Sequence, residues 1–140
     1  MSTYSDYWTG TEYEDELLPK AQDVAYQVSN NAWRMPTKDQ FDALRDNTSF
    51  ERVSDWTSIG NSNGGYFLTS NKNRLSLFLA AAGGYNDGSL STQGDNGFYW
   101  SSTPLSDTGI WYLEFDNENI ATDYTFYRRF GFLVRPVKNK

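Results

Sequence analysis

Apolar positions in the first third of the chain recur at the spacing of an α-helix. The recurring residues are Ala21, Val24, Ala25 and Val28. Because Pro19 suits the first position of a helix, this pattern predicts a helix near residues 19–29. A second helix is predicted to begin at Thr37, since Thr37 and Gln40 have the spacing of a capping box.

After residue 47 the pattern changes to the alternation of apolar and polar positions that is typical of β-strands. Short strands are predicted over 52–59, 65–70, 74–79, 98–102, 110–116 and 131–137, with 118–122 as a further candidate. Runs rich in Gly, Asn and Ser predict a hairpin loop over 60–64 and a long loop over 83–97. Two N-terminal helices followed by many strands predict a single α+β domain spanning 1–140, with a mostly antiparallel, twisted sheet and long loops.

The predicted strand 110–116 would place alternate side chains on opposite faces of its sheet. The inward-facing set would be Trp111, Leu113 and Phe115. The outward-facing set would be Ile110, Tyr112, Glu114 and Asp116. The outward set therefore joins a tyrosine to two acids on one surface.

Aromatic residues are concentrated in the last third of the chain, where 11 lie between Phe98 and Phe132. A short strand and its loop cannot bury so many large rings, which favours an exposed binding face. The predicted ligand-binding residues are Tyr112, Glu114, Asp116, Asp123, Tyr124, Phe126, Tyr127, Arg129 and Phe130.

Composition narrows the function. The net charge of −6 argues against nucleic-acid binding, which needs a basic face. The chain contains no Cys and no His, so it cannot form a Ser-His-Asp triad, a Cys-His pair, a thiolate metal site or a His-based metal centre. We therefore expect no enzymatic activity, no cofactor and no bound metal.

Two features leave alternatives open. The oxygen-bearing residues of 84–88 and the pair Asp95-Asn96 could ligate calcium, but these residue types also form ordinary turns. Arg34 and Arg135 could bind an anion, or each could pair with an acid of the framework.

Four motifs, taken in their order along the chain, resemble the bacterial "major paralogous domain" family first named for Fibrobacter. They are Trp33-Arg34-Met35-Pro36-Thr37, Phe78-Leu79-Ala80-Ala81-Ala82-Gly83, Tyr99-Trp100-Ser101-Ser102-Thr103 and Gly131-Phe132-Leu133-Val134-Arg135-Pro136-Val137. The resemblance covers roughly residues 20–137. It implies a C-type-lectin-like fold related to the formylglycine-generating-enzyme branch.

Some such domains are similar to the variable proteins of diversity-generating retroelements, in which Asn codons near the C-terminus are randomised. The resemblance implies that residues 105–130 are a variable ligand-binding segment, within which Leu113 and Phe115 match fixed positions. Glu114 and Glu118 depart from this pattern, because changes at the adenines of an Asn codon do not give Glu.

These observations predict a non-enzymatic domain that displays a variable, aromatic-rich surface and binds a protein or glycan on a host or neighbouring cell. The alternative is a structural or interaction module of a larger bacterial envelope protein. No signal peptide is visible and the longest apolar run is short, so direct membrane insertion is not expected. A cell-surface or virion location, as in a phage or bacterial adhesin, is expected if the domain belongs to a larger protein.

Overall fold

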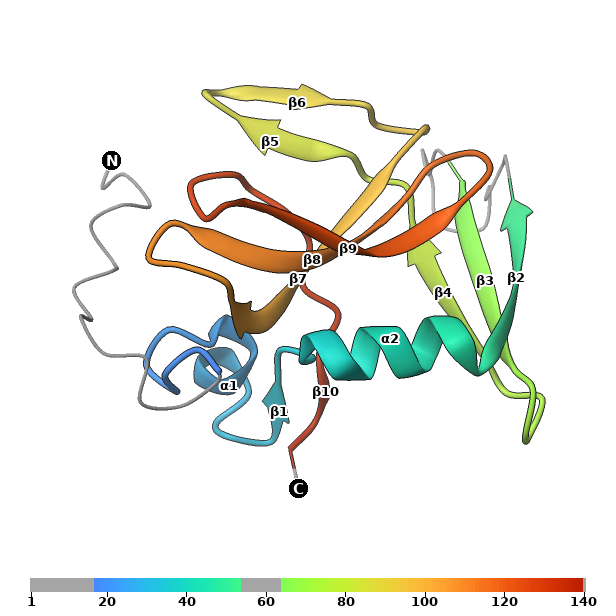
Figure 1. The fold of residues 1–140 in the computed structure, drawn as a ribbon, viewed down its shortest axis with the longest axis horizontal. Helices are drawn as coiled ribbons and strands as arrows, with labels where there is room; N and C mark the ends of the chain where they lie inside the picture. The colour runs from blue at the N-terminus through green and yellow to red at the C-terminus, as the bar shows by residue number, and fades with distance from the viewer. Residues whose placement is uncertain (1–16, 54–63, 140) are drawn as a thin grey trace.

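The computed structural model describes residues 17–53 and 64–139 of the chain. Within this part, 47% of residues are in strands and 12% in helices. The elements are α1 (Val24–Val28), β1 (Trp33–Arg34), α2 (Lys38–Asp46), β2 (Thr48–Val53), β3 (Gly65–Ser70), β4 (Ser76–Ala80), β5 (Gly84–Asn86), β6 (Ser89–Ser91), β7 (Gly97–Pro104), β8 (Gly109–Phe115), β9 (Ile120–Tyr127) and β10 (Val137–Lys138) (Figure 1).

The strands form several small antiparallel sheets. Two sheets have three strands, in the orders β2-β3-β4 and β7-β8-β9. Two further sheets have two strands, β5-β6 and β1-β10, and the latter pairs the segment before α2 with the C-terminal segment. The helix α2 lies below the β7-β8-β9 sheet in the view of Figure 1, and its C-terminal end leads into β2.

The prediction of an α+β, C-type-lectin-like fold is wrong, because the structure is mostly antiparallel β in several small sheets. The apolar spacing over 19–29 gives only the five residues of α1, which begins after the N-cap Asp23. Val24 and Val28 of α1 are exposed, so their spacing does not mark a buried stripe. No helix in the described ranges is long and apolar enough to cross a membrane.

The predicted strands have mixed outcomes. Those over 65–70, 98–102 and 110–116 correspond to β3, β7 and β8, whereas the candidate 118–122 is the start of the longer β9. Over 131–137 the chain forms isolated bridges and the two-residue β10 rather than one strand. Most of the predicted strand 52–59 and of the hairpin loop 60–64 lies outside the described residues.

The helix α2 begins with the predicted capping box. The Gln40 backbone N–H donates to Thr37 Oγ1 at 3.1 Å, and the Thr37 N–H donates to Gln40 Oε1 at 2.9 Å. The apolar side of α2 contributes buried Phe41 to the interior. These local contacts satisfy two N–H groups that no helical carbonyl can reach.

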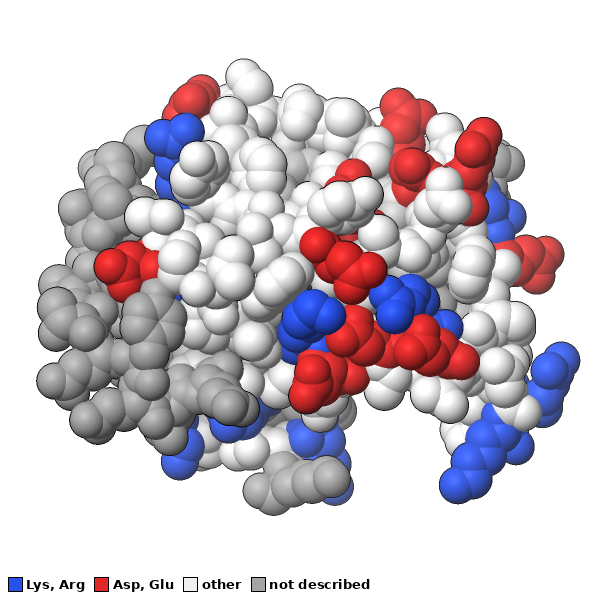
Figure 2. All heavy atoms as spheres, in the orientation of Figure 1, with Lys and Arg blue, Asp and Glu red and all other residues white. Residues whose placement is uncertain are grey.

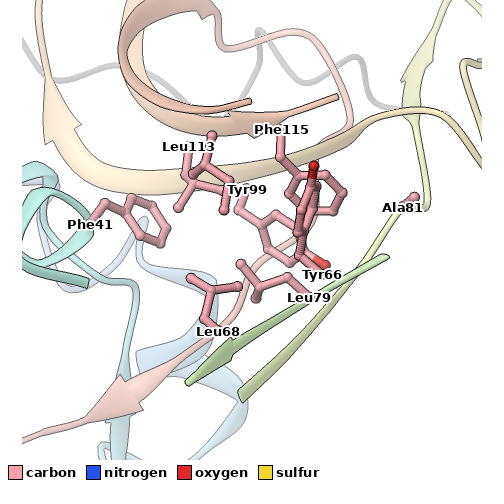
Figure 3. Packing of buried hydrophobic residues seen from close by; sticks show 9 residues of the cluster. Phe41, Tyr66, Leu68, Leu79, Ala81, Tyr99, Leu113 and Phe115 are labelled. Atoms are coloured by element: carbon pink, nitrogen blue, oxygen red, sulfur yellow. The ribbon is translucent and has the colours of Figure 1, made fainter. Parts of the chain in front are cut away.

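The sheet β7-β8-β9 is covered on both faces by apolar side chains. One cluster, which we call the central core, contains Phe41, Tyr66, Leu68, Leu79, Ala81, Tyr99, Leu113, Phe115 and Ile120 (Figure 3). The other, which we call the second core, contains Leu18, Ala25, Met35, Trp100, Ile110 and Tyr112, with Phe98, Phe130, Phe132 and Val134 packed against it.

Two covered faces explain why the predicted alternation in 110–116 is only partly correct. Leu113 and Phe115 are buried as expected. Ile110 and Tyr112, predicted to face outward, are also buried because they belong to the second core.

Candidate ligand-binding face

The strand β9 carries three large exposed aromatic side chains near its C-terminal end. Tyr124, Phe126 and Tyr127 have exposed fractions of 55%, 38% and 56%. Their backbone register sets Tyr124 opposite Tyr112 and Phe126 opposite Ile110 of β8. We call Tyr124, Phe126, Tyr127 and the half-buried Phe130 the outer aromatic face.

The rings of this face rest on one another and on the second core. The centroid of Phe126 lies 4.4 Å from that of Phe130 and 5.9 Å from that of Phe132, and Phe132 stacks on Trp100 at 4.3 Å. Offset and edge-to-face ring contacts at such distances are favourable. The exposed rings are therefore the outer end of a packed aromatic stack, which limits their motion.

Tyr112 lies beneath the outer aromatic face and not on it, so its predicted exposure is wrong. Its side chain is buried, with ring centroids 6.5 Å from Tyr124 and 6.3 Å from Phe126. Its hydroxyl donates to Glu114 Oε2 at 3.0 Å. Burial, followed by the Glu114 carboxylate, raises the pKa of Tyr112 well above its usual range, so the phenol remains a hydrogen-bond donor.

Glu114 is half-buried beside this tyrosine. Its carboxylate accepts from the Tyr112 hydroxyl and from Asn96 Nδ2, the latter at 3.4 Å. A carboxylate has about four acceptor sites, so two bonds leave capacity for a ligand. Glu114 therefore lies next to the buried Tyr112 and remains a candidate hydrogen-bond acceptor for a ligand.

Asp123 belongs to a different surface from the exposed rings. Its carboxylate pairs with Lys38 and Arg45 of α2, each at 3.6 Å. The pairing of β8 with β9 shifts register between Tyr112 and Glu114, close to Asp123. The neighbouring Thr122 hydroxyl donates to Asp42 Oδ1 at 2.5 Å. Figure 2 shows acidic and basic side chains gathered over α2. This ionic network fastens α2 to β9, so Asp123 does not join the outer aromatic face.

Hydrogen bonds within the network shift the pKa values of its members. Burial raises the pKa of Asp42, but hydrogen bonds from Lys38 and Thr122, together with the charges of Lys38 and Arg45, outweigh burial and lower that pKa overall. The hydrogen bond to Asp42 raises the pKa of Lys38. Both groups are therefore ionised at neutral pH, as a salt bridge requires.

Asp116 is also separate from the exposed rings. It follows β8 at the turn into β9, where its Oδ1 accepts from the backbone N–H groups of Glu118 and Asn119, both at 2.8 Å. Those two donors lower the pKa of Asp116. The turn lies at the opposite end of β8 from Gly109, which pairs with Tyr127, so the predicted single patch containing Asp116 is wrong.

Arg129 borders the outer aromatic face as predicted. Its guanidinium lies 5.4 Å from the ring centroid of Tyr127 and 5.6 Å from that of Phe130. Cation–π contacts of this length stabilise the arginine next to the rings. Arg129 therefore places a positive charge beside the outer aromatic face, whereas Glu114 lies next to Tyr112 beneath it.

Tyr85 of β5 is a neighbouring exposed ring that the sequence interpretation missed. Its backbone exchanges two hydrogen bonds with Gly131, of 2.8 and 2.7 Å, which brings the β5-β6 hairpin beside Phe130. The hairpin turn at Asp87-Gly88 has positive φ angles of 47° and 83°, as a type I′ turn requires. A two-residue Asp-Gly loop between short strands was the signal for this hairpin.

The residues of the calcium alternative take part in turns. Asp87 serves the β5-β6 turn, while the N–H groups of Asp95 and Asn96 both donate to the Thr92 carbonyl. Within 17–53 and 64–139, no three acidic, His or Cys residues group as metal ligands would.

The family described as "Domain of unknown function (DUF8237)" matches residues 56–137, a stretch that contains β3 to β9 and the whole outer aromatic face. Neither the curated proteins nor the solved structures contain a match to the chain. Because the match covers more than half of the sequence, the chain belongs to the DUF8237 family.

Proposed function

We propose that this domain is a non-enzymatic ligand-binding module whose outer aromatic face binds a protein or a glycan on a host or neighbouring cell. The exposure of Tyr124, Phe126 and Tyr127 side by side on β9 carries the proposal. Adjacent exposed rings are costly in water, and such patches usually mark an interaction site.

Rigid support makes the face suited to binding. Tyrosine and phenylalanine rings give a large contact area for little loss of conformational entropy, and the stack beneath them reduces that loss further. Glu114 can accept hydrogen bonds from a ligand, and Arg129 can donate them. These two charged side chains would orient the ligand and reject unsuitable partners.

We also propose that the exposed positions of 105–130 vary among copies of the gene. Tyr124 and Tyr127 are more than half exposed, so replacing them leaves the interior intact. Sequencing the surrounding genome tests this: a reverse transcriptase gene beside a near-copy of the segment that encodes 105–137 supports variation. A neighbourhood with neither feature contradicts it.

A double variant, Tyr124→Ser with Tyr127→Ser, tests binding by the face. Both variant and parent are applied to an oligosaccharide array and to a displayed peptide library. The variant should lose every interaction of the parent while its unfolding free energy changes by about 0.5 kcal/mol or less per site. Leu75→Ser, which alters a similarly exposed apolar residue in the β3-β4 turn, should leave binding unchanged.

Two results would contradict the proposal. Retained binding in the double variant would place the ligand site elsewhere. A large loss of stability would show that the rings have a structural role, which favours the alternative of an interaction module in a larger envelope protein.

A further inference from the structure

A concave surface lies away from the outer aromatic face and shares no residue with it. It is a groove of about 460 Å³ between α2, β4 and the two segments that pair as β1 and β10. Eight of its ten lining residues are apolar, among them Trp33, Leu44, Leu77 and Val137. Ligand sites for small molecules have comparable volumes and are lined mainly by apolar side chains.

The remaining two lining residues, Gln40 and Arg135, both offer hydrogen-bond donors. Gln40 uses its side-chain oxygen to accept from the Thr37 N–H in the capping box, which leaves its amide nitrogen available. The guanidinium of Arg135 donates but cannot accept. The polar part of this groove therefore matches a ligand that accepts hydrogen bonds.

Arg135 is also an uncompensated charge. The other arginine that the sequence marked for either an anion or a framework acid, Arg34, pairs with the buried Asp23 at 3.4 Å. Arg135 is exposed and has no ion pair with any acid in the described part of the chain. An unpaired cation in a groove without acidic lining is complementary to an anion, although the whole chain is acidic.

We propose that this groove binds a small carboxylate with an apolar body. The body would lie against Trp33, Leu44 and Leu77, and the carboxylate would receive hydrogen bonds from Arg135 and Gln40. Arginine suits this role because its planar guanidinium matches a carboxylate in two parallel hydrogen bonds. The site shares no residue with the outer aromatic face and does not depend on the function proposed above.

Decanoate tests the proposal, with decanol and decylamine as probes that have the same apolar body and a different head group. Each is titrated into the full 140-residue chain and followed by calorimetry and by amide chemical shifts. Decanoate should bind saturably, more tightly than the other two, and should shift the amides of Leu44, Leu77 and Val137.

Substitutions then test how much the charge of Arg135 contributes to binding. Arg135→Gln should weaken decanoate binding about 10-fold or more, the usual value of a charged hydrogen bond. Arg135→Lys should restore part of the loss. Gln40→Glu preserves the capping box but adds a negative charge, so it should weaken decanoate and favour decylamine. Arg74→Gln, which alters an exposed arginine in the turn between β3 and β4, is the matched control and should have no effect.

Several outcomes would overturn the proposal. These are absence of saturable decanoate binding, equal binding of decanoate and decanol, and unchanged affinity in Arg135→Gln. Amide shifts confined to β9 would assign the probe to the outer aromatic face instead.

Discussion

Replacing Asp23 with alanine is expected to lower the unfolding free energy by about 2–5 kcal/mol. The carboxylate of Asp23 is completely buried and serves three donors from different parts of the chain. It accepts from the backbone N–H of Tyr26 at 3.0 Å, from that of Met35 at 3.0 and 3.1 Å, and from Arg34 Nε at 3.4 Å. It thus caps α1 and fixes the segment that leads into α2.

The magnitude follows from what each donor loses. Loss of the N-cap bond to Tyr26 costs about 1 kcal/mol. The buried N–H of Met35 would be left without its side-chain partner, which costs about 1–3 kcal/mol. The contact with Arg34 adds at most about 1 kcal/mol, because that arginine remains partly exposed. Asp23→Asn keeps one acceptor oxygen and should cost roughly half as much.

Urea denaturation at neutral pH, followed by tryptophan fluorescence, measures these differences. Asp46→Ala is the matched control, because Asp46 also pairs with an arginine but is exposed, and it should change stability by about 0.5 kcal/mol or less. If Asp23→Ala costs less than about 1 kcal/mol, the three bonds do not hold the N-terminal segment as inferred.

Two further predictions concern packing and pH. Gly97→Ala should destabilise the domain by about 3 kcal/mol in denaturant melts, since a Cβ at Gly97 would overlap the Phe115 ring. Gly109→Ala, which meets only flexible Ser106 and Leu105 side chains, should cost much less, and equal costs would contradict the packing. Asp42 and Asp116 have lowered pKa values in the folded state, so their ionisation stabilises the fold. This contribution is fully present at a pH above the unfolded-state pKa of about 3.9, and it is lost as the pH falls through the folded-state pKa values. When the unfolding free energy is measured between pH 6 and pH 2, it should therefore decrease once the pH is lower than about 4. An equally large decrease in an Asp42→Asn, Asp116→Asn double variant would assign the pH dependence to other acids.

Helix caps and strands were predictable from the sequence where their signals come from residues close together in the chain. The capping box at Thr37 and the strands 65–70 and 110–116 are examples, because their signals lie within a few positions. The fold class was not predictable in the same way. Helical apolar spacing over 19–29 suggested a long helix, yet only Ala25 of α1 is buried, so tertiary packing and not periodicity sets its length.

The outer aromatic face shows why a high density of aromatic residues in the sequence does not tell which of the rings are exposed. Tyr112 and Tyr124 sit opposite each other on adjacent strands, yet the first is buried and the second exposed. The difference arises because segments distant in sequence, around Leu18 and Phe132, cover β8 but leave much of the edge strand β9 uncovered. Since core and surface rings form one continuous stack, only the coverage supplied by those distant segments separates the buried rings from the exposed ones.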